Sequence, residues 1–115
     1  MGAHSIDGIL AGQNLRDAYD EAVKDALHYH GHDPYNGTIS TTNGTKRFRG
    51  EVPECFKTAI VKPWGEHTEE EREAINKIED AALNQSEKWE EVVVIEVAPD
   101  KDGTRRWWFC GWAAS

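Results

Sequence analysis

The stretch VVVIEVAPDKDGTRRWWFCGW, residues 92–112, decides the fold. Residues 92–98 are apolar at nearly every position, which is typical of a strand that is buried on both faces in the middle of a sheet. Residues 99–103, Pro-Asp-Lys-Asp-Gly, predict a hairpin loop. Residues 104–112 then return as a second strand, because strands joined by so short a loop pair antiparallel. The centre of the sheet is therefore expected to be an antiparallel pair.

Two amphipathic helices are expected beside this sheet. The first begins after Asn14, a typical N-cap residue, with Asp17 near the positive end of the helix dipole, and Gly31 ends it. The second begins after Thr68, which forms a capping box with Glu71. Both helices carry apolar residues three and four positions apart, so each has one face that can pack on the sheet.

Four further strands complete the predicted order. Asn43-Gly44 is a strong hairpin signal, and it joins the second and third of these strands. The fourth could also be a single helical turn, and we interpret it as a strand. We therefore predict an α+β fold, a single antiparallel β-sheet with two helices packed on one face, and we expect residues 1–115 to form a single domain. The four strands are expected at residues 4–11, 38–42, 45–49 and 57–62.

The net charge of −8 is concentrated in one part of the chain. Residues 66–91 hold ten acidic and three basic side chains, so this window carries −7 of the total. Such a surface could mimic DNA or dock on a basic partner protein, and Glu70, Glu73 and Asp80 are the candidate contacts. The alternative is a solvated helix whose acidic first turn suits the helix dipole. The overall charge argues against nucleic acid as a partner attracted by bulk charge, although a local basic patch stays possible.

Two short segments combine basic and aromatic side chains. Lys46, Arg47 and Arg49 surround Phe48, and residues 105–108 read Arg-Arg-Trp-Trp. Cations beside aromatic rings can hold a phosphate and stack a base. The alternative is a pair of half-exposed strands whose basic side chains protect a sheet edge from aggregation.

The last strand is aromatic on both faces. Trp107 and Phe109 share one face, and Trp108, Cys110 and Trp112 share the other. Helices on one side of the sheet would leave an aromatic face to be covered, so we expect a homo-oligomer or a binding surface, with Trp107 as a candidate partner contact. The alternative is that long side chains of the same chain cover the second face.

No catalytic, metal or cofactor site can be assigned. His28 and His32 have the helical spacing of two metal ligands, but Gly31 falls between them and no ligand set completes the site. Cys55 and Cys110 form no CxxC pair, so we predict two free thiols and no metal. Since no nucleophile is paired with a base, an enzyme is less favoured than a binding protein. No apolar run reaches the roughly 20 residues of a membrane span, and no secretion signal is present.

Two segments carry a family resemblance. The motif Gly-His-x-x-Tyr-x-Gly-Thr-Ile at residues 31–39 and the end Trp-Phe-Cys-Gly-Trp-Ala-Ala-Ser at residues 108–115 resemble a family of small bacteriophage proteins. The resemblance covers about the first 40 residues and the last 10. It implies an accessory protein that acts in the host bacterial cytoplasm, and it marks residues 32–38 as a special loop.

Two functions are thus expected. The first is a non-enzymatic phage accessory protein that binds a host macromolecule, for example a host bacterial protein, through the acidic helix or the aromatic strand. The alternative is a small-ligand or nucleotide-binding protein that uses residues 32–38 without a further cofactor. Its candidate ligand contacts are His32, Tyr35, Gly37, Thr38, Arg47 and Trp112.

Overall fold

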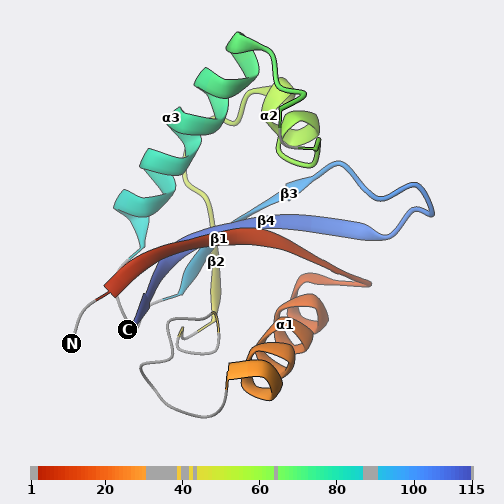
Figure 1. The fold of residues 1–115 in the computed structure, drawn as a ribbon, viewed down its shortest axis with the longest axis vertical. Helices are drawn as coiled ribbons and strands as arrows, with labels where there is room; N and C mark the ends of the chain where they lie inside the picture. Colours follow the sequence, from red (N-terminus) through yellow and green to blue (C-terminus); the bar gives the residue numbers. More distant parts are fainter. Residues whose placement is uncertain are drawn as a thin grey trace.

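The computed structural model describes residues 3–30, 39, 42, 44–63, 65–86 and 91–114, and it has the α+β class that the sequence predicts (Figure 1). Within these ranges, none of the helices combines the length and the apolar content that crossing a membrane requires. The strands are β1 (Ala3–Gly12), β2 (Thr45–Arg47), β3 (Val92–Val97) and β4 (Arg105–Ala114), and the helices are α1 (Leu15–His30), α2 (Glu54–Ala59) and α3 (Glu69–Gln85).

The described strands form one mixed sheet in the order β1-β4-β3-β2. The pairs β1–β4 and β3–β4 are antiparallel, whereas β2 pairs with β3 in parallel. The prediction of a purely antiparallel sheet was therefore wrong at β2. The chain passes through α2 and α3 between β2 and β3, and a crossover of this length allows a parallel pair. The predicted hairpin between β3 and β4 is confirmed, since Asp100 N donates to Thr104 O at 2.9 Å.

Helices cover both faces of this sheet, so packing on one face was a wrong prediction (Figure 1). Side chains alternate along β3: Val93 and Ile95 belong to a core with α2 and α3, while Val92 and Val94 belong to a second core with α1. The physical reason lies in β3 itself. A strand that is apolar on both faces requires a cover on each side.

Both predicted helix starts are confirmed. Asp17 N donates to Asn14 Oδ1 at 2.9 Å before α1. Glu71 N donates to Thr68 Oγ1 at 3.2 Å, and Thr68 N donates to Glu71 Oε1 at 3.0 Å, which completes the capping box of α3. Lys62 Nζ lies 2.8 Å from Glu71 Oε2. The hydrogen bonds from Lys62 and Thr68 lower the pKa of Glu71 to about 2.

Two predicted strands were placed differently. Residues 57–62 are not a strand, because residues 54–59 form α2, whose Phe56 and Ala59 are fully buried. The predicted strand 38–42 lies mostly outside the described residues, and its described members form a turn in which Thr42 N donates to Ile39 O at 3.0 Å. The strand expected at 45–49 exists as β2, and its described partner is β3.

Candidate functional site

The aromatic last strand is buried on both faces. Trp107 is 4% exposed and Trp108 is 1% exposed, because α1 covers one face and α2 and α3 cover the other. Trp107 therefore does not offer its face to a partner, and the two aromatic faces no longer require a second subunit. Trp112, a candidate ligand contact, donates its Nε1–H to Leu83 O at 3.0 Å and thereby ties β4 to α3.

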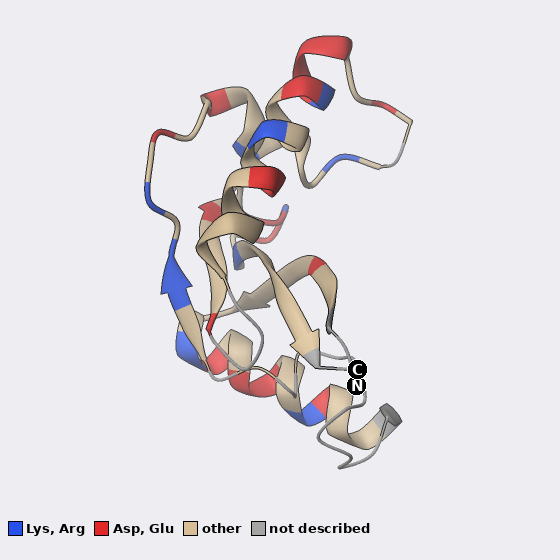
Figure 2. Ribbon diagram, turned by 90° about the vertical axis from the view of Figure 1, so that its left-hand side faces the viewer, with Lys and Arg blue, Asp and Glu red and all other residues tan. Residues whose placement is uncertain are grey.

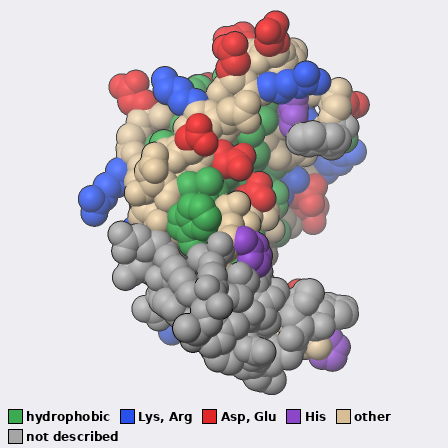
Figure 3. Space-filling model, turned by 60° about the vertical axis from the view of Figure 1, so that its left-hand side comes forward, with side chains coloured by type: hydrophobic (Ala, Val, Ile, Leu, Met, Phe, Trp, Pro, Cys, Tyr) green, Lys and Arg blue, Asp and Glu red, His purple; other side chains and the backbone are tan. Residues whose placement is uncertain are grey.

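The three candidate acidic contacts on α3 lie at the surface, as expected. Glu70, Glu73 and Asp80 are all exposed. Lys77 is also exposed and, by helical spacing, lies on the same stripe between Glu73 and Asp80. Figure 3 shows acidic side chains interspersed with Lys and Arg on the face that it presents. This mixture is typical of a solvated helix, and docking through α3 stays a prediction.

The loop marked by the family resemblance lies outside the described residues. His32, Tyr35, Gly37 and Thr38 all belong to it. Of the candidate ligand contacts, Arg47 and Trp112 are the described ones, and they do not meet: Arg47 is at the edge of the sheet in β2, whereas Trp112 hydrogen-bonds to the end of α3.

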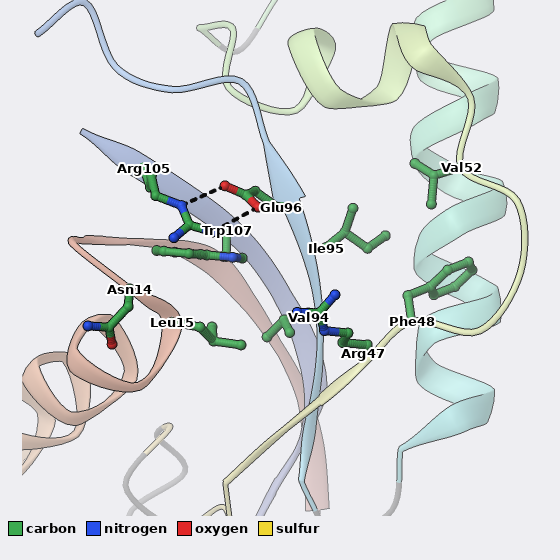
Figure 4. A pocket seen from close by; sticks show the side chains of 10 residues that line it. All are labelled: Asn14, Leu15, Arg47, Phe48, Val52, Val94, Ile95, Glu96, Arg105 and Trp107. Atoms are coloured by element: carbon green, nitrogen blue, oxygen red, sulfur yellow. Dashed lines mark hydrogen bonds and ion pairs between the residues drawn. The ribbon is translucent and has the colours of Figure 1, made fainter. Parts of the chain in front are cut away.

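A groove of about 390 Å³ lies at the edge of the sheet where β2 ends (Figure 4). The three residues of β2 pair only with the first half of β3, from Val92 to Val94. After Phe48, whose N–H donates to Val94 O at 3.1 Å, the chain leaves the sheet towards α2. Ile95 and Glu96 of β3 therefore line an open groove, together with Arg47, Phe48, Arg105 and Trp107.

An ion pair between Arg105 of β4 and Glu96 of β3 lines one wall of this groove. Arg105 donates from Nε and Nη2 to the two oxygens of Glu96, at 2.9 and 3.1 Å. Its guanidinium carbon lies 5.0 Å from the centre of the Trp107 ring. The hydrogen bond from Arg105, with the nearby charges of Arg105 and Arg47, lowers the pKa of Glu96. The same contact raises the pKa of Arg105. A planar cation is thus held against an aromatic ring, with about half of its side chain exposed, 51%.

Arg47 supplies a second cation on the opposite side of the groove. It is exposed at the end of β2 and lies in register with Val94, on the same face of the sheet. Among the described residues, the Arg47 guanidinium has no hydrogen bond and no ion pair within 4.0 Å. Figure 2 shows that β2 is basic along most of its length, while acidic residues are spread over the helices. The groove is therefore a local cationic site on an acidic protein.

A larger cavity of about 580 Å³ lies between β1, α3 and the loop after α2. Two of its lining groups are already paired: Lys62 forms an ion pair with Glu71, and His67 Nε2 donates to Ala59 O at 2.7 Å. Burial and the charges of Asp7 and Asp80 raise the pKa of Glu79 in its wall. No third ligand joins these groups, since the described residues contain no cluster of three His, Cys, Asp or Glu able to hold a metal ion.

Both cysteines are free thiols in the structure, as predicted. Cys110 is 1% exposed, and burial together with the charges of Glu79 and Asp7 raises its pKa to about 12. Such a thiol is not a nucleophile at neutral pH.

No protein-family model, curated protein or solved structure matches this chain. The resemblance to a bacteriophage family therefore stays a prediction from two sequence segments. The case for a function depends on the groove, which joins the two basic-aromatic segments that the sequence analysis identified. Glu96 was missed there, because only the pairing of β3 with β4 brings it to Arg105.

Proposed function

We propose that this chain is a non-catalytic binding protein whose edge groove holds a nucleotide. Arg47 would bind the phosphate, and the exposed face of Arg105 would stack on the base. The single observation that carries the proposal is the meeting of two distant basic-aromatic segments in one groove, with one arginine ion-paired and the other without a partner among the described residues. Sequestering a nucleotide also agrees with the accessory role that the sequence resemblance implies.

The fixed arginine supports the stacking part of the proposal. Bases stack on guanidinium planes as well as on aromatic rings, and a stacked base contributes about 1–3 kcal/mol. Glu96 and Trp107 hold Arg105 in one orientation, so little side-chain entropy is lost when a base is added. Phe48, on the other side of the groove, adds a half-buried ring to the apolar wall.

The unpaired arginine supports the phosphate part. A guanidinium forms bidentate hydrogen bonds with a phosphate, and hydrogen bonds to charged groups contribute about 1.5–3 kcal/mol. Arg47 gives up no described hydrogen bond or ion pair when it binds an anion. The groove volume of about 390 Å³ lies near the lower end of the range of ligand pockets, roughly 300–1,000 Å³, which suits a single nucleotide.

The test is a calorimetric titration with nucleoside mono- and diphosphates. Arg47→Ala should weaken binding about ten- to a hundredfold, the loss of one charge-assisted contact. Arg49→Ala is the matched control, because Arg49 is also exposed and basic but does not line the groove. The control should bind as the wild type does.

Three ligands separate the chemistry. A nucleoside without phosphate should lose the Arg47 contact, and inorganic phosphate should lose the stacking contact, so each should bind more weakly than the nucleotide. The proposal fails if no nucleotide binds, or if Arg47→Ala and Arg49→Ala weaken binding equally.

A further inference from the structure

The strand β1 forms the sheet edge opposite the groove, and no strand among the described residues pairs with its outer side. It pairs with β4 over all ten residues without interruption, and β4 is its one neighbour in the described sheet. Strand edges of this length are templates for pairing with another chain.

The direction of the free backbone groups follows from the hydrogen bonds at the other edge. Val92 N donates to Gly44 O and Phe48 N donates to Val94 O, so the even-numbered residues of β3 face β2. The odd-numbered residues of β3 therefore face β4, where they pair with even-numbered residues. The backbone groups of the odd-numbered residues of β4 then face β1, and their partners there are the even-numbered residues of β1. The outward N–H and C=O groups belong to Ser5, Asp7, Ile9 and Ala11.

The strand β1 lacks several of the usual protections of an edge strand. Its sequence AHSIDGILAG contains no Lys or Pro, and its register with β4 has no bulge. No described residue outside β4 forms a backbone hydrogen bond with it. Ile9 is 40% exposed, the most exposed large hydrophobic side chain among the described residues. Asp7 is the one acidic side chain on the strand.

We infer that β1 pairs antiparallel with β1 of a second copy, so that two four-stranded sheets become continuous. A two-fold axis perpendicular to the sheet keeps the α1 face of both copies on the same side. Each residue of β1 must therefore lie opposite a residue of the second copy whose side chain points to the same face. With Gly8 at the axis, Ile6 opposes the second copy's Leu10 on the α1 face, and Asp7 opposes Ile9 on the other. Gly8 brings no side chain to the axis.

Asp7 disfavours the neighbouring register with the axis one residue earlier. An axis at Asp7 would place two carboxylates directly opposite each other, with Cα atoms about 5.5 Å apart, and like charges in that position are destabilising. Moving the axis by one residue to Gly8 turns this pair into diagonal neighbours about 7–8 Å apart. The apolar Ile6 and Leu10 become opposite at the same time, which favours a second copy over an unrelated peptide.

The first test is sedimentation velocity across a range of concentrations. The 13.0-kDa chain should form a dimer whose fraction rises with concentration. Ile9→Asp should weaken dimerisation about tenfold, because it places a carboxylate directly opposite Asp7 of the second copy on both sides of the axis, and like charges in that position are destabilising. Lys101→Ala is the control: it also makes the net charge more negative by one, at an exposed residue of the β3–β4 loop, and it should leave the dimer intact.

The second test fixes the register by disulfide formation in a Cys55→Ser background. Ser5 and Ala11 should oppose each other across the axis, with Cα atoms about 5.5 Å apart, a distance that a disulfide spans. The double variant Ser5→Cys, Ala11→Cys should cross-link into dimers, and each single variant should not. A chain that stays monomeric at all concentrations, or a dimer that persists unchanged in Ile9→Asp, overturns the inference. So does a monomer that binds extended peptides along β1.

Discussion

Replacing Phe56 by alanine tests the core that α2 and α3 form on one face of the sheet. Phe56 is fully buried, and its ring meets Trp108 edge to face with the centroids 5.3 Å apart. The other members of this core come from α3, β3 and β4. The side chain therefore joins a six-residue helix, which cannot be stable alone, to the centre of the sheet.

The expected loss is large. A buried phenylalanine truncated to alanine costs about 3–5 kcal/mol, the sum of the transfer term and the cavity that remains. The edge-to-face contact with Trp108 accounts for about 0.5–1.5 kcal/mol beyond the buried area. Since domains of this size are stable by about 5–15 kcal/mol, Phe56→Ala should remove a large share of the free energy of unfolding.

Urea unfolding followed by tryptophan fluorescence and by circular dichroism measures this loss. Cys55→Ala is the matched control, because Cys55 is the preceding residue of α2 and is only half-buried. We expect the control to lose less than about 1 kcal/mol. If Phe56→Ala also loses less than about 1 kcal/mol, or no more than the control, Phe56 does not anchor α2 to the sheet.

Three further outcomes follow from the described contacts. The pKa of Glu71 is lowered from 4.5 to about 2, so its contribution to stability is complete above pH 4.5 and is lost as the pH falls towards 2. In Glu71→Gln, the midpoint of urea unfolding should therefore depend less on pH over this interval than it does in the wild type. Gly111→Ala should cost about 1–3 kcal/mol, since a β-carbon there would lie 3.3 Å from Val92 Cα, and a stability equal to the wild type's would contradict this packing. Iodoacetamide at pH 8 should label Cys55 in the native protein and leave Cys110 unmodified until urea is added, because burial raises the pKa of the Cys110 thiol to about 12.

Local signals in the sequence were sufficient to predict several elements. The loop 99–103, the N-cap at Asn14 and the capping box at Thr68 each depend on residues a few positions apart, and the structure confirms all three. The burial of β3 on both faces was also predicted from its composition, and it is confirmed. Contacts of this range are encoded by propensity and hydrogen-bonding chemistry alone.

Long-range pairing was not predictable in the same way. Residues 57–62 contain Ala59, Ile60 and Val61, a run too short for its period to separate a strand from a helical turn. The parallel position of β2 depends on where α2 and α3 return the chain, which no local pattern records. For the same reason the sequence identified Arg47 and Arg105 as parts of two separate segments, and only the sheet order brings them to one groove.

The distribution of charge also limits the kind of nucleotide ligand. Of the net charge of −8, residues 66–91 carry −7, so most of the negative charge lies outside the basic edge formed by β2. The whole described fold measures 38 × 31 × 26 Å, and a polynucleotide of more than a few residues would leave the groove and cross this acidic surface. Repulsion there acts on every additional phosphate, whereas Arg47 neutralises only the first. Affinity per molecule should therefore fall as an oligonucleotide is lengthened, and an affinity that rises with length would assign the basic edge to single-stranded nucleic acid instead.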